Sequence, residues 1–315
     1  MIQVAILDDY QRAALEVVDW SALDGRAGIT VFADRFADED TAVAALADFD
    51  AVVAMRERTP FPRSLLDRLP RLRLLVTTGM RNSAIDLEAA QELGICVCGT
   101  GSLASSTVEH TWALILGSSR HLVEEAGNMA GDRWQTTLGT GLAGKTLGIV
   151  GLGRLGTAVA KIGDAFGMRV LAWSQNLTAE RAAAAGAELV GFEDLLSASD
   201  VVSVHQVLSD RTRDLIGAPE LAAMRATALL VNTSRGPIVN TEALIAAVDQ
   251  GVIAGAALDV YDEEPLPPGH PLRSTPGILA TPHLGYVSRD GYEVFYGEAV
   301  EDVVGFLDGA PVRQL

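Results

Sequence analysis

The sequence predicts an α/β protein made of two doubly wound parallel-sheet domains, one inserted into the other. Short apolar strand candidates alternate with helix candidates along the chain, which is typical of parallel strands covered by helices on both faces. A glycine-rich turn in the middle of the chain separates one such strand from an Ala-rich helical segment. The chain has 315 residues, enough for two domains of about 150 residues each.

Residues 1–99 predict five strands with helices between them. We expect strands at 3–7, 29–32, 51–54, 72–77 and 95–98, and helices at 41–47, 63–67 and 86–93. An amphipathic helix is expected at 288–307, and no strand follows it. We therefore expect residues 285–315 to pack on residues 1–99 as one flavodoxin-like domain.

Residues 100–284 predict a second sheet, of the Rossmann type. A long helix at 105–125 and a polar, glycine-rich arm at 127–144 come first. Strands are then expected at 147–150, 169–172, 188–190, 201–205, 228–232, 255–258 and 277–280. The chain would cross between the two domains near Thr100 and again near His283.

Composition restricts the classes of function. The formal net charge of −17 argues against nucleic acid, because binding to a phosphate backbone needs clustered Lys and Arg. No apolar run is long enough for a bilayer, and the first residues lack a basic signal-peptide start, so we expect a cytoplasmic protein with no membrane partner. Cys96 and Cys98 would lie about 6.6 Å apart on one strand, at the far limit of disulfide geometry. We expect neither a disulfide nor a metal site there.

The turn VGLGRLG at 150–156 matches the dinucleotide-binding pattern G-x-G-x-x-G, after a strand and before a helix. Gly151 permits the turn, Gly153 lets the backbone approach a pyrophosphate, and Gly156 lets the helix pack closely on the strand. The helix N-terminus would bind the diphosphate through its free N–H groups. The cofactor contacts expected from this turn are Gly151, Leu152, Gly153, Arg154, Leu155 and Gly156.

A second glycine-rich segment, 139–146, fits the P-loop pattern G-x-x-x-x-G-K-T letter for letter. A P-loop leaves a strand and enters a helix. This segment leaves the polar arm and enters a strand, so we do not expect it to bind a nucleoside triphosphate.

The end of the next strand bears on the choice between NAD and NADP. Enzymes that use NAD usually place Asp or Glu about 20 residues after the glycines, where it binds the adenosine ribose. Here the strand ends in Ser174, Gln175 and Asn176, without an acid. We expect Ser174 and Gln175 to contact an NAD(P) cofactor with a modest preference for NADP, although only Arg154 is at hand for a 2′-phosphate.

Three ionisable residues follow later strands: Arg235 in NTSRG, Glu264 in DVYDEEP and His283 in TPHLG. Each one alone is more often a surface or turn residue, but open α/β sheets bind ligands at the carboxyl ends of their strands. Together they supply what reduction of a 2-keto acid needs. Arg235 would fix the carboxylate and polarise the carbonyl, His283 would deliver the proton, and Glu264 would keep the imidazole protonated near neutral pH.

These segments, with GLGRLG and the His205 that follows VVSV, resemble the D-isomer-specific 2-hydroxyacid dehydrogenase family. That family includes 3-phosphoglycerate dehydrogenases and glyoxylate/hydroxypyruvate reductases, and the resemblance covers essentially the whole chain. It implies that Arg235, Glu264 and His283 form the catalytic set. The further cofactor contacts that it implies are His205, Thr233, Asp259, His283 and Gly285.

The resemblance also implies a homodimer contact through the arm before Gly144, and substrate contacts from the first domain. The family's G-x-G loop reads TGMRN here, so Arg81 replaces the second glycine and either projects toward the substrate or points to solvent. The segment RERT resembles the loop over the substrate in phosphoglycerate dehydrogenases. The substrate contacts implied are Arg56, Gly79, Met80, Arg81 and Arg235.

The sequence therefore predicts an NAD(P)-dependent dehydrogenase that interconverts a small 2-keto acid and its D-2-hydroxy acid. A non-catalytic, corepressor-like dinucleotide sensor is the alternative, because fold and cofactor site do not prove turnover. Formate dehydrogenases on the same scaffold pair their His with Gln, so Glu264 argues against that chemistry. Substrate identity depends on pocket shape, which one sequence does not specify.

Overall fold

The computed structural model describes all residues, Met1–Leu315. The chain divides into two compact units: unit 1 comprises residues 1–103 and 287–315, and unit 2 comprises residues 104–286. The limits expected from the sequence are 99/100 and 284/285. None of the helices is both long and apolar enough to cross a membrane. Nowhere does the structure gather three or more His, Cys, Asp or Glu side chains in a metal-binding arrangement.

Unit 1 contains a five-stranded parallel sheet with the strand order β2-β1-β3-β4-β5. Its strands are β1 (Ile2–Ile6), β2 (Ala27–Val31), β3 (Ala51–Ala54), β4 (Leu74–Thr77) and β5 (Cys96–Gly99). Each boundary lies within two residues of its prediction. The order 2-1-3-4-5 is that of flavodoxin-like folds.

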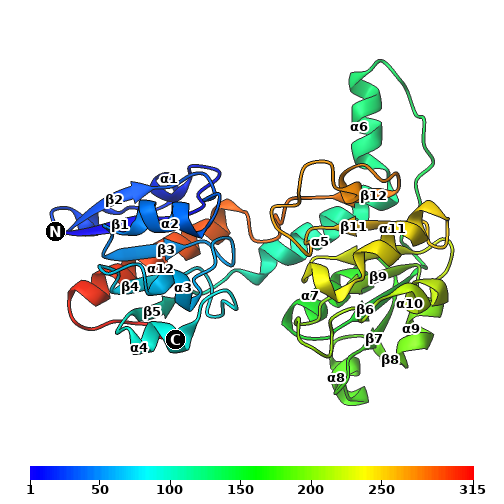
Figure 1. The fold of residues 1–315 in the computed structure, drawn as a ribbon. Helices are drawn as coiled ribbons and strands as arrows, with labels where there is room; N and C mark the ends of the chain where they lie inside the picture. The colour runs from blue at the N-terminus through cyan, green and yellow to red at the C-terminus, as the bar shows by residue number, and fades with distance from the viewer. The chain divides into compact units, whose positions relative to one another are not determined.

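Helices cover both faces of this sheet. They are α1 (Ala14–Val17), α2 (Glu39–Leu46), α3 (Arg63–Leu66), α4 (Leu87–Glu92) and α12 (Arg289–Leu307). Leu46 of α2 and Leu65 of α3 pack with Val52 of the sheet on one face. On the other face α12 contacts β4 and buries Phe295 and Tyr296. The C-terminal helix α12 therefore belongs to unit 1 (Figure 1).

The C-terminal tail pairs with the edge of the same sheet. Gln314 lies opposite Cys98, and the Leu315 N–H donates to the Val97 carbonyl at 2.9 Å. Cys96 and Cys98 are both free thiols, with their Sγ atoms 3.8 Å apart. Burial raises the pKa of the Cys98 thiol to about 12, so this thiol stays protonated at neutral pH.

Unit 2 contains a seven-stranded parallel sheet with the order β12-β11-β10-β9-β6-β7-β8. Its strands are β6 (Thr146–Val150), β7 (Arg169–Trp173), β8 (Glu188–Leu189), β9 (Val201–Val204), β10 (Leu229–Asn232), β11 (Gly255–Leu258) and β12 (Ile278–Ala280). Counted from β6, the first six strands follow the Rossmann order 3-2-1-4-5-6, and β12 extends the edge. The predicted fold class, two doubly wound parallel sheets, is confirmed. The P-loop-like segment runs directly into β6.

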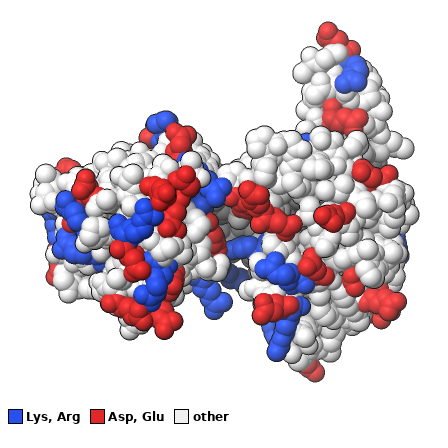
Figure 2. Space-filling view, viewed as in Figure 1, with Lys and Arg blue, Asp and Glu red and all other residues white.

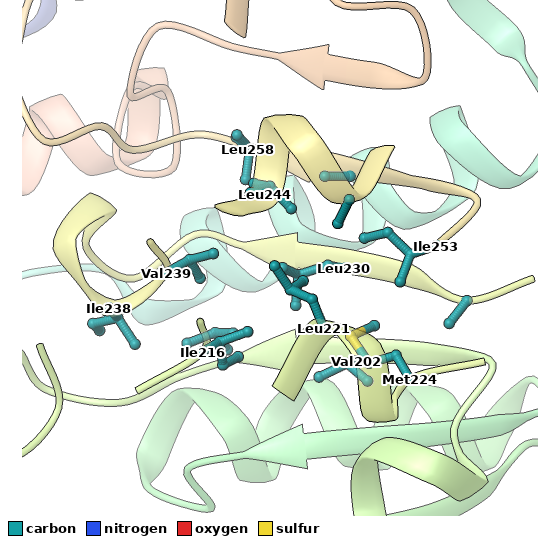
Figure 3. Packing of buried hydrophobic residues seen from close by; sticks show 14 of the residues in the cluster. Val202, Ile216, Leu221, Met224, Leu230, Ile238, Val239, Leu244, Ile253 and Leu258 are labelled. Atoms are coloured by element: carbon teal, nitrogen blue, oxygen red, sulfur yellow. The ribbon is translucent and has the colours of Figure 1, made fainter. Parts of the chain in front are cut away.

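The helices of unit 2 are α5 (Ala104–Ser119), α6 (Leu122–Ala130), α7 (Arg154–Ala165), α8 (Ala179–Ala184), α9 (Phe192–Ala198), α10 (Ala218–Ala223) and α11 (Thr241–Asp249). Successive strand residues point to opposite faces, so Val201 and Val202 enter different cores. Figure 3 shows Val202 near Leu221 of α10, in the cluster that also contains Leu244 of α11. Trp112 of α5 packs in the opposite core.

The predicted single helix at 105–125 is wrong, because the structure has two helices there, α5 and α6. His121 between them has a left-handed backbone with a φ of 49° and is the N-cap of α6. The Ser119 carbonyl accepts the Thr140 N–H of the returning arm at 2.7 Å. A continued helix would have used that carbonyl for its own hydrogen-bond ladder.

The segment predicted as a polar arm is partly helical and exposes three large apolar side chains, Met129, Trp134 and Leu138. α6 extends to Ala130, and Figure 1 shows it standing away from the sheet of unit 2. In Figure 2 uncharged atoms cover most of its visible face. The large apolar side chains exposed on α6 and the arm are Leu122, Val123, Met129, Trp134 and Leu138.

Candidate active site

The glycine-rich turn joins β6 to α7 at the carboxyl edge of the sheet of unit 2. Gly151 has a φ of 106°, and its N–H donates to the Trp173 carbonyl at 2.8 Å. A Cβ at Gly151 would lie 2.5 Å from the carbonyl oxygen of His205. A Cβ at Gly156 would collide with the carbonyl oxygen of Gly151. Backbone packing therefore demands glycine at both positions.

Gly153 is constrained differently, since nothing lies within 4 Å of the place where its Cβ would be. It is the N-cap of α7, with no side-chain cap, and exposed Arg154 and half-buried Leu155 follow it. Open space beside a helix N-terminus lets a pyrophosphate approach the free backbone N–H groups. The turn thus fits a dinucleotide, while Leu152 packs into the core beneath it.

Ser174 follows β7 directly and contacts this turn. Its hydroxyl oxygen accepts the Leu152 N–H at 3.0 Å. Gln175 and Asn176 are exposed. No carboxylate follows β7 where NAD enzymes usually bind the adenosine ribose.

His205 and Thr233 follow β9 and β10 at the same edge. Desolvation lowers the pKa of His205 to about 4, so its ring is neutral at pH 7. Its Nε2 shares a hydrogen bond of 2.8 Å with the Ser203 hydroxyl. The buried Thr233 hydroxyl pairs with that of Thr111 on α5 at 2.8 Å. Both residues are neutral polar groups at the edge where such sheets bind ligands.

Arg235 follows β10 in a turn that Asn232 shapes. The Asn232 side chain accepts the Ser234 N–H at 3.0 Å and donates to the Arg235 carbonyl at 2.9 Å. Nη1 of Arg235 donates to the Ser234 carbonyl at 2.8 Å. Gly236 begins the 3₁₀ turn Gly236–Ile238 and lies so close to the Tyr261 backbone that a Cβ would collide with it. These contacts hold Arg235 at the carboxyl edge of the sheet.

Glu264 and His283, which are separated in the sequence, form a direct pair. Nδ1 of His283 lies 2.6 Å from Oε2 of Glu264, and Oε1 of Glu264 accepts the Tyr261 N–H at 2.9 Å. His283 has a left-handed φ of 53°, a strained conformation of the kind found at functional sites. No protein group hydrogen-bonds Nε2 of His283. The carboxylate therefore orients the ring and leaves Nε2 available to a ligand.

Asp259 anchors the loop that carries His283. Its Oδ1 accepts hydrogen bonds from His110 Nε2 at 3.1 Å, the Thr281 hydroxyl at 2.6 Å and the Leu284 N–H at 2.7 Å. Its Oδ2 accepts the Gly285 N–H at 2.8 Å. Burial raises the pKa of this carboxyl, but the hydrogen bonds outweigh burial and hold the pKa below its usual value. Both oxygens are thus engaged within the protein.

The predicted substrate residues of unit 1 follow β3 and β4. Arg56, with a φ of 52°, donates its N–H to the Thr78 hydroxyl at 2.8 Å and Nη1 to the Thr78 carbonyl at 3.0 Å. Its guanidinium lies against Gly79, where a Cβ would collide with it. Met80 and Arg81 are exposed, and their backbone N–H groups donate no hydrogen bond within the protein. A guanidinium beside free N–H donors suits an anion.

Sequence reasoning missed several polar residues that build these sites. The role of Asn232 could have been predicted from the sequence, because Asn side chains commonly accept a backbone N–H two residues later. The roles of Thr281 and Thr100 could not have been predicted, because their hydrogen-bond partners lie far away in the sequence. Thr100, for example, accepts the Gly79 N–H at 2.9 Å.

A family model for the NAD binding domain of D-isomer specific 2-hydroxyacid dehydrogenases matches residues 112–285. The glyoxylate reductase of Aeropyrum pernix is 44% identical over 255 residues, which cover 78% of this chain and 76% of that protein. The D-3-phosphoglycerate dehydrogenase of Bacillus subtilis is 35% identical over 267 residues, which cover 84% of this chain and 50% of that protein. The phosphoglycerate oxidoreductase structure from Vibrio cholerae has a TM-score of 0.94 at 37% identity, covering 98% of this chain and 100% of that one.

The Rossmann sheet, its glycine turn and the carboxylate–imidazole pair at its edge define an oxidoreductase that uses a nicotinamide dinucleotide. The chain belongs to the D-isomer specific 2-hydroxyacid dehydrogenase family. The family predicted from the sequence is confirmed, and the protein is a 2-hydroxyacid dehydrogenase.

Proposed function

We propose that the protein reduces a small 2-keto acid to its D-2-hydroxy acid, and catalyses the reverse oxidation, with His283 as the acid and base. The observation that carries this proposal is the 2.6 Å pair between His283 Nδ1 and Glu264, with Nε2 of the ring left without a protein partner. The relatives named glyoxylate reductase and D-3-phosphoglycerate dehydrogenase support a substrate of this class.

His283 would donate the proton to the carbonyl oxygen of the substrate through Nε2. A bound nicotinamide supplies or accepts the hydride in such a reaction. Glu264 accepts Nδ1–H, so it fixes the ring orientation and stabilises the positive charge of the imidazolium. In the oxidation direction the same Nε2 would remove the hydroxyl proton.

Arg235 would bind the substrate carboxylate and polarise the adjacent carbonyl. A guanidinium presents two parallel N–H donors to a carboxylate, and a lysine ammonium does not reproduce this geometry. We assign anion recognition in unit 1 to the Arg56 guanidinium, which also donates to the Thr78 carbonyl, and to the N–H groups of Met80 and Arg81, which have no backbone acceptor within the protein.

The glycine turn and the end of β7 would hold NAD(P), with NADPH accepted at least as well as NADH. The absence of a carboxylate after β7 removes a group that would repel a 2′-phosphate. Arg154, the exposed first residue of α7, is the cation of this turn that would bind a 2′-phosphate.

We also propose a homodimer through α6 and the arm of unit 2. Trp134 is 73% exposed and Leu138 is 93% exposed, and isolated monomers rarely present several such side chains on one projecting element. Light scattering of the purified protein tests this, with Trp134→Glu and Leu138→Glu expected to yield monomers. A monomeric wild type at micromolar concentration would contradict the proposal.

The activity is tested by following oxidation of NADH and NADPH at 340 nm in the presence of glyoxylate, hydroxypyruvate, pyruvate, phenylpyruvate and 3-phosphohydroxypyruvate. We expect turnover of at least one of these acids, and a D-configured product from any acid whose product is chiral. Arg235→Lys should lower kcat/KM about ten- to hundredfold, because one charge-assisted hydrogen bond contributes about 1.5–3 kcal/mol. Arg169→Lys, whose partner Glu188 is exposed, is the matched control and should behave as wild type. No turnover with any of the five acids would contradict the proposed function.

A further inference from the structure

Tyr261 touches the segments that carry all three proposed catalytic residues. Its N–H donates to Oε1 of Glu264 at 2.9 Å. Its hydroxyl donates to the Thr281 carbonyl at 2.8 Å, two residues before His283. Its backbone lies against Gly236, the residue after Arg235. Tyr261 thus contacts the Glu264 turn through its backbone N–H and the His283 turn through its hydroxyl.

We propose that Tyr261 is a positioning residue for the Glu264–His283 pair, acting through its hydroxyl. This inference rests on the proposed function for its kinetic consequences, although the geometry of the pair is measurable without turnover. Tyr261 does not touch the reacting atoms in this proposal, so its effect passes entirely through Glu264 and His283.

The hydroxyl acts at the point where the backbone of the His283 turn is strained. The Thr281 carbonyl accepts both the Tyr261 hydroxyl and, at 3.0 Å, the N–H of His283. His283 itself has a φ of 53°, a conformation that non-glycine residues keep only when their surroundings enforce it. Fixing the Thr281 carbonyl therefore fixes the direction from which His283 approaches Glu264.

The same residue restrains the carboxylate from the other side. Because the Tyr261 N–H binds Oε1, the second oxygen, Oε2, is presented to Nδ1 of His283. Tyr261 is 7% exposed, and burial together with the charges of Asp259 and Glu264 raises the pKa of its phenol. The phenol thus remains a hydrogen-bond donor throughout the pH range in which the enzyme would work.

A core tyrosine can also stabilise a fold simply by packing, so the variant must keep the ring. Tyr261→Phe removes only the hydroxyl and leaves the backbone N–H bond to Glu264 intact. The matched control is Tyr292→Phe on α12, whose buried phenol donates to the Gln11 side chain of unit 1 at 2.9 Å. Thermal unfolding of both variants checks that they fold.

We expect Tyr261→Phe to lower kcat about three- to tenfold with KM for the 2-keto acid within about twofold, since one neutral hydrogen bond is lost. The control should keep wild-type kcat. In a Glu264→Ala background, where His283 Nδ1 has lost its partner, Tyr261→Phe should have almost no further effect on kcat. Equal fold-changes in both backgrounds would overturn the proposal, because they would show that Tyr261 acts independently of the pair.

Proton NMR of the imidazole N–H region tests the geometry without substrate. The short Nδ1–H···Oε2 bond should give a downfield resonance that Glu264→Ala removes. We expect Tyr261→Phe to shift or broaden this resonance while Tyr292→Phe leaves it unchanged. An unchanged resonance in Tyr261→Phe would overturn the positioning role. An inactive wild type with the expected NMR change would instead contradict the proposed function alone.

Discussion

Two glycines with positive φ follow strands at the carboxyl edges of the two sheets, and different kinds of neighbour constrain them. In unit 2, a Cβ at Gly151 would lie 2.5 Å from the backbone carbonyl oxygen of His205. In unit 1, a Cβ at Gly79 would meet only the guanidinium end of Arg56. A carbonyl after a sheet strand cannot move without disturbing the strand, whereas a guanidinium can rotate to another rotamer.

This difference in what surrounds the two glycines indicates that the two edges have different functions. The edge of unit 2 is held by backbone packing and part-buried hydrogen bonds, which keep Glu264 and His283 in one geometry, as the proposed proton transfer would require. The edge of unit 1 presents the Arg56 guanidinium beside the N–H groups of Met80 and Arg81, which donate no hydrogen bond within the protein. Such a surface suits recognition of an anion more than chemistry on it.

The largest effect should come from removing the proposed acid of unit 2. We expect His283→Ala to lower kcat about 10²–10⁴-fold while the Kd for NAD(P)H changes little, because proton transfer by a positioned side chain contributes a factor of that size. Steady-state kinetics and fluorescence titration of the cofactor measure the two quantities. A variant with near-normal kcat would show that His283 is not the acid. It would also contradict the proposal that the proton transfer takes place at the edge of unit 2.

The rigid neighbour of Gly151 predicts a loss of stability. We expect Gly151→Ala to lower the free energy of unfolding of unit 2 by about 2–5 kcal/mol, the combined cost of the left-handed backbone and of overpacking. Urea denaturation measures it. Gly153→Ala is the matched control, since its Cβ enters open space. The control should unfold like wild type yet bind NAD(P)H more weakly, because its methyl group occupies the surface offered to the pyrophosphate.

The flexible neighbour of Gly79 predicts a change in substrate binding with a smaller change in stability. We expect Gly79→Ala to displace the Arg56 guanidinium and to raise KM about tenfold, the loss of about one charge-assisted hydrogen bond. In an Arg56→Ala background the same substitution should leave KM unchanged. A stability loss as large as that of Gly151→Ala would show that the two glycines are constrained alike, and the comparison would then be wrong.

The last effect concerns the choice of cofactor and should be about as large as that of Gly79→Ala. We expect wild type to use NADPH at least as well as NADH, and Ser174→Asp to shift the ratio of kcat/KM toward NADH about tenfold, or about 1.4 kcal/mol. The new carboxylate can still accept the Leu152 N–H, so the turn should persist, while its charge repels a 2′-phosphate. A tenfold preference of wild type for NADH would contradict the interpretation of Ser174.

The comparison of the two glycines also shows what could be predicted from sequence. Gly151 stood out because its motif, strand and helix are contiguous in the chain, and short-range spacing is enough to recognise them. The contact between Gly79 and Arg56 could not be predicted, since Arg56 follows another strand and reaches Gly79 only when β3 and β4 pair. The helix break at His121 was missed for the same reason, as the arm that caps Ser119 returns from Thr140.

The sequence by itself determined the alternation of strands and helices, the class of two doubly wound sheets and the dinucleotide turn, and it singled out Arg235, Glu264 and His283 as the predicted catalytic set. These depend on local patterns of burial and on residue chemistry. Tertiary structure alone decided that Glu264 and His283 meet at 2.6 Å, that Asp259 uses both its oxygens to anchor the His283 loop, and that the Tyr261 hydroxyl lies on the Thr281 carbonyl. Those contacts join segments that only the folded sheet brings together, and hydrogen bonds over 2.6–3.1 Å depend on backbone positions that no residue pattern specifies.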